Sequence, residues 1–147
     1  MSGLSIRSRA PSASSPTVRR VMIANRSSNT VPERLLRSAL FKNGMRFRQN
    51  VRPISNIKCK ADILFRNQRL CIFVDGCFWH GCPEHFECPK TNSSWWNEKI
   101  EATKDRDRTQ TALLKTAGWN VVRIWEHEIT LEKVSSVVKR VKRRLLL

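Results

Sequence analysis

The sequence lacks a run of about 18 or more apolar residues, so no membrane-spanning helix is expected. It also lacks the apolar N-terminal stretch of a secretory signal, and residues 1–20 contain many Ser and Arg but no acid. We therefore predict a flexible basic N-terminal arm over residues 1–20, followed by one domain over residues 21–147. No internal repeat divides that domain.

Acidic residues are scarce as well. Only 12 Asp and Glu stand against 28 Lys and Arg, which gives a formal net charge of +16 and an isoelectric point near 10.9. Such an excess of positive charge indicates a polyanionic partner, and nucleic acid is the first candidate. The alternative is a basic surface that only faces solvent.

The five cysteines are an odd number without a secretory context. That argues against a disulfide framework and favours reduced thiols, some of which could bind a metal. Cys59 and Cys71 stand in strand-like apolar segments, where packing is the simpler role.

Hydrophobic spacing predicts the order helix, strands, helix, strand, helix. The expected helices cover residues 29–44, 93–118 and 130–147, and the expected strands cover residues 45–53, 61–65, 70–74 and 119–129. Thr30 and Glu33 form a capping box for the first helix, Ser93 or Ser94 caps the second, and Gly118 ends it. This order predicts an α/β domain with a mixed sheet covered by helices.

The stretch FVDGCFWHGCPEHFEC, residues 73–88, contains most of the potential metal ligands. The candidates for a tetrahedral zinc site are Cys77, Cys82, His85 and Cys88, with His127 as a fifth from the later segment WEHE. Four protein ligands leave no open coordination position, so a zinc ion here is expected to be structural. The alternative is buried free cysteines beside surface histidines.

Two acids stand at the ends of the expected hairpin. Asp62 begins one apolar strand and Asp75 follows the next, and two close carboxylates make a Mg²⁺ site. Each acid could instead simply end a strand at a turn. His80 is a candidate general base. Glu33 and Asp107 are further acids, which could equally serve as a helix cap and as part of a solvated charged face.

From about Met22 to Ile129, the chain resembles the very-short-patch repair (Vsr) endonucleases. The resemblance rests on NTVPERLL, ADILF, FVDGCFWHGCP, WWNEKI, DRDR and GWNVVRIWEHEI, which follow one another in the family's order. It implies a restriction-endonuclease-like α/β core, with a mixed central sheet flanked by helices and a structural zinc site. It also implies a bacterial, cytoplasmic and nucleoid-associated enzyme, without membrane contact, that acts on double-stranded DNA as a monomer. Its reaction would be a Mg²⁺-dependent nick of one strand next to a T:G mismatch.

The resemblance also implies roles for single residues. Asp62 would be the main Mg²⁺ ligand, and Asp75 the second metal position through at least its backbone carbonyl. His80 would be the general base, Asp107 would orient it, and Glu33 would support the site from the first helix.

Further implied roles concern DNA and zinc. Phe78 and Trp79 match aromatic residues that wedge into the duplex, and Met22 matches an apolar residue that enters the minor groove. The implied zinc ligands are Cys77, Cys82, His85 and His127, which leaves Cys88 as an extra cysteine that could replace His85.

The chain departs from the family where KCKAD replaces Gly-x-Pro-Asp before the first core strand. Two alternative functions stay open. One is a Vsr-like nuclease of a mobile element or restriction system without mismatch preference. The other is a non-catalytic, zinc-stabilised DNA-binding module, which the retention of Asp62, His80 and Asp107 argues against.

Overall fold

The computed structural model describes residues 29–146, so Met22 and the expected basic arm lie outside the described residues. The elements are α2 (Val31–Lys42), β1 (Arg48–Val51), β2 (Ala61–Phe65), β3 (Leu70–Asp75), α3 (Ser93–Thr116), β4 (Asn120–Trp125), the 3₁₀ helix η1 (Glu126–Glu128) and α4 (Val134–Leu145). This order confirms the predicted succession of helices and strands. Within the described range, none of the helices is both long and apolar enough to cross a membrane.

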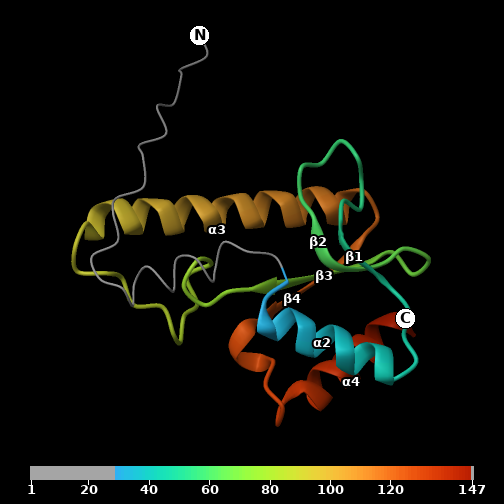
Figure 1. Ribbon diagram of the computed structural model, residues 1–147. Helices are drawn as coiled ribbons and strands as arrows, with labels where there is room; N and C mark the ends of the chain where they lie inside the picture. The colour runs from blue at the N-terminus through green and yellow to red at the C-terminus, as the bar shows by residue number, and fades with distance from the viewer. Residues whose placement is uncertain (1–28, 147) are drawn as a thin grey trace.

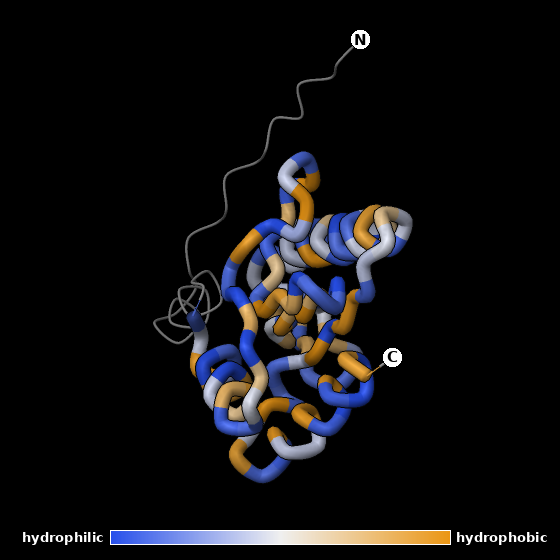
Figure 2. The backbone as a smooth tube through the Cα atoms, turned by 90° about the vertical axis from the view of Figure 1, so that its right-hand side faces the viewer, coloured by the Kyte–Doolittle hydropathy of each residue, from blue (hydrophilic) through white to orange (hydrophobic). Residues whose placement is uncertain are grey.

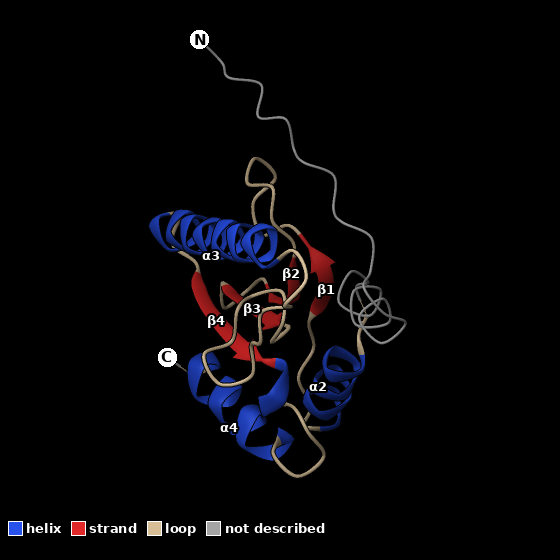
Figure 3. Cartoon of the chain, turned by 90° about the vertical axis from the view of Figure 1, so that its left-hand side faces the viewer, coloured by secondary structure: helices blue, strands red, loops and turns tan. Residues whose placement is uncertain are grey.

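The four strands form one mixed sheet in the order β1-β2-β3-β4. β1, β2 and β3 are antiparallel neighbours, which confirms the predicted hairpin of β2 and β3. β4 instead runs parallel to β3, with Val74 opposite Ile124. Helix α3 lies along one face of the sheet, and α2 and α4 lie together on the other (Figures 1 and 3). The fold is therefore three layers with the sheet in the middle.

Apolar side chains fill the space on both faces of the sheet. Against α2 and α4, the core contains Leu36, Ile63 and Val141, all fully buried. Against α3, a second cluster joins Leu64 and Leu114. Cys59 and Cys71 belong to this second cluster, so their predicted packing role is confirmed. Figure 2 shows the apolar strand segments enclosed between helices of mixed hydropathy.

Helix α2 begins as predicted, with a small change in the cap. The Thr30 side chain accepts the Glu33 backbone N–H at 3.5 Å. The Glu33 carboxylate accepts the backbone N–H of Asn29 at 2.9 Å, one residue before the position of a standard capping box. Glu33 is thereby held, buried, at the start of the helix.

Four predicted elements have wrong boundaries, and the first is the strand expected over residues 45–53, which covers only Arg48–Val51. Helix α3 has Asn92 as its N-cap residue, in the left-handed region at φ 58° and without a side-chain cap, so neither serine caps it. The strand expected over 119–129 ends at Trp125, because the Glu128 carboxylate accepts the Trp125 N–H and the chain turns into η1. Helix α4 starts at Val134 rather than at residue 130. The predicted end of α3 is confirmed, since Gly118 adopts φ 92° just beyond it.

Candidate active site and metal centre

A pocket of about 390 Å³ opens where the start of α2, the β2–β3 hairpin, the middle of α3 and the end of β4 meet. All five predicted catalytic residues line it, together with one of the two predicted wedge residues. The lining consists of Thr30, Glu33, Lys58, Cys59, Lys60, Asp62, Phe73, Val74, Asp75, Gly76, Trp79, His80, Arg106, Asp107, Gln110, Arg123 and Glu126. Acids therefore concentrate in one pocket of a strongly basic protein.

Asp62 lies near the start of β2, and its side chain points across the hairpin. Its Oδ2 accepts the backbone N–H of Val74 at 2.6 Å. Burial raises the pKa of Asp62 to about 6 despite this hydrogen bond, and the negative charges of Glu33 and Asp75 add to the rise. A carboxylate in these surroundings is stabilised by any cation that enters the pocket.

His80 and Asp107 form a close pair between the loop after β3 and helix α3. His80 Nδ1 lies 2.5 Å from Asp107 Oδ2 and 3.7 Å from Asp75 Oδ1. Burial raises the pKa of Asp107, but the His80 hydrogen bond and the charges of His80 and Arg123 outweigh it and lower the pKa below its ordinary value. An ionised Asp107 fixes the proton of the imidazole on Nδ1, so Nε2 is the nitrogen that can accept a proton.

The loop that carries His80 packs tightly on α3 through Gly81. A Cβ at Gly81 would lie 2.5 Å from the Lys104 side chain and 2.7 Å from that of Ile100, and the residue has φ +62°. Only glycine meets both conditions without strain. This close approach brings His80 within reach of Asp107 on the same helix.

Two pocket residues were missed by sequence reasoning. Arg123 on β4 donates from Nη1 to both carboxylate oxygens of Asp75, at 2.9 and 3.2 Å. Glu126 on η1 accepts the backbone N–H of Cys77 at 2.9 Å. A single arginine inside the apolar run VVRIW was the only signal for Arg123, and nothing in the sequence pointed to Glu126.

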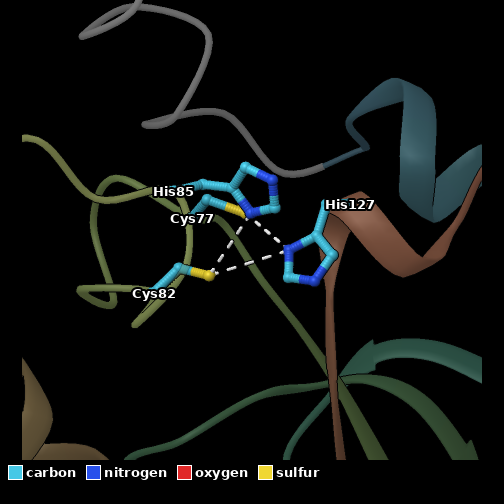
Figure 4. Close-up of side chains that lie close together, drawn as sticks. All are labelled: Cys77, Cys82, His85 and His127. Carbon is cyan, nitrogen blue, oxygen red and sulfur yellow. Dashed lines mark hydrogen bonds between the residues drawn. The ribbon is translucent and has the colours of Figure 1, made fainter.

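Four side chains that could bind a metal converge beside the pocket (Figure 4). Cys77, Cys82, His85 and His127 each offer one ligand atom, and these atoms all lie within 4.8 Å of one another. Cys77 Sγ lies 3.2 Å from His127 Nδ1, and Cys82 Sγ lies 3.7 Å from Nδ1 of both histidines. The S···N edge of a tetrahedral zinc site is about 3.5 Å, so the donor set and its spacing fit zinc.

The structure brings together the same four side chains that the resemblance implied as zinc ligands. Cys88 lies outside the group, with its thiol directed at the carbonyls of Pro89 and Ser93, so the alternative in which Cys88 replaces His85 is not favoured. The group differs from the prediction in one respect, since His127 comes from η1 and not from a strand. Burial raises the pKa of the Cys77 thiol above its ordinary value, so a bound cation is needed to keep its thiolate at neutral pH.

The two predicted wedge residues sit in an aromatic cluster on the start of α3. The ring centroids of Phe78 and Trp79 lie 5.3 Å apart. The ring of Trp96 lies 5.2 Å from that of Phe78 and 5.6 Å from that of Trp79, again between centroids. Both residues are half-buried, and the Trp79 indole N–H is a buried donor without a partner among residues 29–146. The structure thus brings these aromatic side chains together at the pocket, whereas Met22 lies outside the described residues.

Comparisons with known proteins identify nicking enzymes and mismatch endonucleases as relatives of this chain. A family described as "DNA mismatch endonuclease Vsr" matches residues 14–86. The chain is 47% identical to Type II nicking enzyme V.NaeI of Lentzea aerocolonigenes, over 81% of this chain and 73% of the relative. It is 39% identical to V.XorIIP of Xanthomonas oryzae, also a Type II nicking enzyme, over 79% of this chain and 85% of the relative. It is 33% identical to the DNA mismatch endonuclease Vsr of Escherichia coli, over 71% of this chain and 66% of the relative.

Proposed function

The chain belongs to the Vsr family of DNA endonucleases, and from this premise we propose that it nicks one strand of double-stranded DNA beside a T:G mismatch in a Mg²⁺-dependent reaction. One observation carries the proposal. The half-buried carboxylate of Asp62, whose pKa burial raises, lines the same pocket as the His80–Asp107 pair. A metal-binding acid beside an oriented base is what hydrolysis of a phosphodiester needs.

The pocket fits a hard divalent cation. Oδ2 of Asp62 accepts the Val74 N–H, while no hydrogen bond or ion pair within residues 29–146 engages Oδ1. Asp62 would therefore be the main ligand of the ion, and residue 75 would contribute through its backbone carbonyl, because Arg123 holds the Asp75 carboxylate. When bound, Mg²⁺ polarises the scissile phosphate and stabilises the leaving oxygen.

His80 performs the proton transfer. With Nδ1 bound to Asp107, its Nε2 takes the proton of the attacking water. Asp107 keeps the imidazole in this orientation and stabilises the positive charge that forms on it. Glu33, held by Asn29 and paired with Arg37 at 3.6 Å, supports the pocket wall from α2.

Mismatch preference is supported by the aromatic cluster. Inserting Phe78 and Trp79 between base pairs costs a few kcal/mol, and the cost is lowest where pairing is already weak, as at a T:G mismatch. Zinc held by Cys77, Cys82, His85 and His127 would tie the loop of these aromatic residues to η1. We infer a restriction-endonuclease-like core that acts as a monomer on nucleoid DNA in a bacterial cytoplasm.

A second candidate function is nicking without mismatch preference. V.NaeI and V.XorIIP, which share more identity with this chain than E. coli Vsr does, are named as Type II nicking enzymes, and their names mention no mismatch. In this alternative the same pocket performs the same hydrolysis, and the aromatic cluster serves only to bind the duplex.

One assay separates the two functions. Purified protein with Mg²⁺ is given a T:G-mismatched duplex and the matched duplex of the same sequence, each labelled on both strands. We expect a nick in one strand of the mismatched duplex, about 10²–10⁴-fold slower in His80→Ala and absent in Asp62→Asn. Equal nicking of both duplexes supports the second function. Binding without cleavage by the wild-type protein would remove the catalytic assignment.

A further inference from the structure

Residues 58–60, with the sequence Lys-Cys-Lys, lead into β2 and form part of the pocket wall. They belong to KCKAD, where the chain departs from the family, and the proposed reaction gives them no role. Cys59 is buried in the apolar cluster that also contains Leu114 of α3. The lysines on either side of it, Lys58 and Lys60, are exposed. The buried thiol therefore anchors the segment, while two cations stay accessible at the pocket wall.

Helix α3 fixes the position of this segment and adds a third cation. Gln110 Nε2 donates to the carbonyl oxygen of Lys58 at 3.3 Å, and Figure 1 shows the β1–β2 loop beside the C-terminal half of the helix. Residues four apart lie on the same face of a helix. Arg106, four residues before Gln110, therefore lies on the face that meets the loop, and it too is exposed and lines the pocket.

These three cations differ from their neighbours on α3 because they have no acidic partner. Lys104 and Arg108 each form an ion pair with the acid three residues earlier, at 3.2 and 2.8 Å. Among residues 29–146, no ion pair or hydrogen bond engages the side chains of Lys58, Lys60 or Arg106. An ammonium or guanidinium group without a partner is available to an anion that reaches the pocket.

The acids of the same pocket explain why such cations are needed. Asp62, Asp75 and Asp107 repel every phosphate of a DNA strand that approaches them. The one phosphate that is bound by a metal ion escapes this repulsion, but its neighbours along the strand remain charged. Burial raises the pKa of Asp107, and the His80 hydrogen bond and nearby charges, that of Arg106 among them, lower it. Arg106 is thus close enough to the acids to offset their charge.

We propose that Lys58, Lys60 and Arg106 form a phosphate-binding subsite, which holds the DNA strand to be cut by the phosphates next to the scissile one. The lysines supply point charges, and the planar fork of Arg106 binds a phosphate through two N–H groups. The inference deepens the proposed function and rests on it for the identity of the cut strand. Contact with backbone phosphates is measured without cleavage, so the two can fail separately.

Neutralising single phosphates of the DNA tests the subsite. Each duplex of a set carries one uncharged methylphosphonate linkage at a different position, and its affinity for full-length protein is measured by fluorescence anisotropy in Mg²⁺-free buffer. We expect one or two linkages of the cut strand, beside the nick, to weaken binding by the wild type about tenfold. Lys58→Ala with Lys60→Ala should bind the unmodified duplex about tenfold or more weakly, and the same linkages should then cost nothing further. Arg106→Ala should behave in the same way at an adjacent linkage.

Two variants serve as controls. Arg108→Ala removes an exposed arginine of α3 that is paired with Asp105, and it should keep the wild-type pattern of sensitive linkages. Lys58→Arg with Lys60→Arg retains both charges and should keep that pattern as well. Zinc content and the thermal unfolding midpoint show that each variant is folded.

The proposal is overturned if every linkage weakens the double alanine variant as much as the wild type, or if the sensitive linkages lie in the uncut strand or away from the nick. A wild-type protein that binds but does not nick would remove the proposed function, whereas the loss of linkage sensitivity in the alanine variants would still establish the phosphate contacts.

Discussion

Among the carboxylic acids of the described residues, Asp62 is the one whose ionisation the fold opposes most clearly. Burial raises its pKa from 3.8 to about 6. A group with a raised pKa contributes stability that is fully present below its ordinary value and is lost as the pH rises through the folded value. The Mg²⁺-free protein is therefore expected to lose stability between about pH 4 and about pH 6. At 1.36 kcal/mol per pH unit, the loss is at most about 3 kcal/mol.

Asp62→Asn should remove this loss. The amide oxygen keeps the Val74 hydrogen bond without a buried charge, so in Mg²⁺-free buffer the variant is expected to exceed the wild type by up to about 3 kcal/mol near pH 8. The difference disappears near pH 4, where the wild-type carboxyl is also neutral. Urea unfolding at several pH values measures both quantities.

The matched control is Asp105→Asn, an exposed acid of the same protein, which should leave the pH dependence of stability unchanged. Added Mg²⁺ should stabilise the wild type more than Asp62→Asn, since only the wild type supplies the charged ligand. A difference between wild type and Asp62→Asn that stays constant with pH would show that burial of the charge is not its cause.

At the scale of elements, η1 connects three parts of the molecule. Glu126 anchors the loop after β3, His127 joins the cysteine cluster, and Glu128 accepts the Trp125 N–H while pairing with Arg140 of α4. Glu84 lies 3.6 Å from His127 Nε2, on the side away from the sulfur atoms. A carboxylate in this position orients a metal-binding imidazole.

Cysteine variants test which side chains hold the metal. We expect about one zinc per chain in the wild type, loss of zinc and a lower unfolding temperature in Cys82→Ala, and unchanged zinc in Cys88→Ala. Elemental analysis and thermal unfolding, with and without a chelator, measure the two effects. Zinc retained by Cys82→Ala but lost by Cys88→Ala would reverse the assignment.

At the scale of the whole molecule, the charges are distributed unevenly. Five of the twelve acids line the pocket, while α4 buries Val137, Val138 and Val141 and turns basic residues outward. Exposed cations of this helix are Lys139, Lys142, Arg143 and Arg144. A surface of this kind attracts DNA through its phosphates and positions the protein without reading sequence.

Salt dependence tests this surface. Replacing Lys139, Arg143 and Arg144 by alanine should weaken binding equally for matched and mismatched duplexes. For every phosphate that the protein no longer neutralises, the slope of log K against log salt should become shallower by about 0.9. Fluorescence anisotropy without Mg²⁺ measures the slope. Arg66→Ala, on the β2–β3 turn at the opposite end of β3 from the pocket, is the control and should leave the slope unchanged. An unchanged slope in the triple variant would exclude α4 from the DNA interface.

Much of the fold and of the site follows from the sequence, because the relevant signals are local. Continuous apolar runs with β-branched residues predicted β2 and β3, and the Thr30 cap marked the start of α2. The element boundaries that were predicted wrongly depend on contacts or backbone conformations that the local sequence pattern does not reveal. The end of β4 depends on the Glu128 side chain, and the start of α3 depends on a left-handed Asn92.

The sequence by itself determined the order of elements and supplied the cysteine, histidine and acidic side chains that are candidate ligands and candidate catalytic groups, since local patterns of neighbouring residues carry both signals. Only the tertiary structure decided that Arg123 pairs with Asp75 across 48 residues, and that His85 rather than Cys88 joins His127. The physical reason is that ion pairs and metal ligands depend on distances of a few ångströms. Those distances exist only after the sheet has brought β3, β4 and the following loops together.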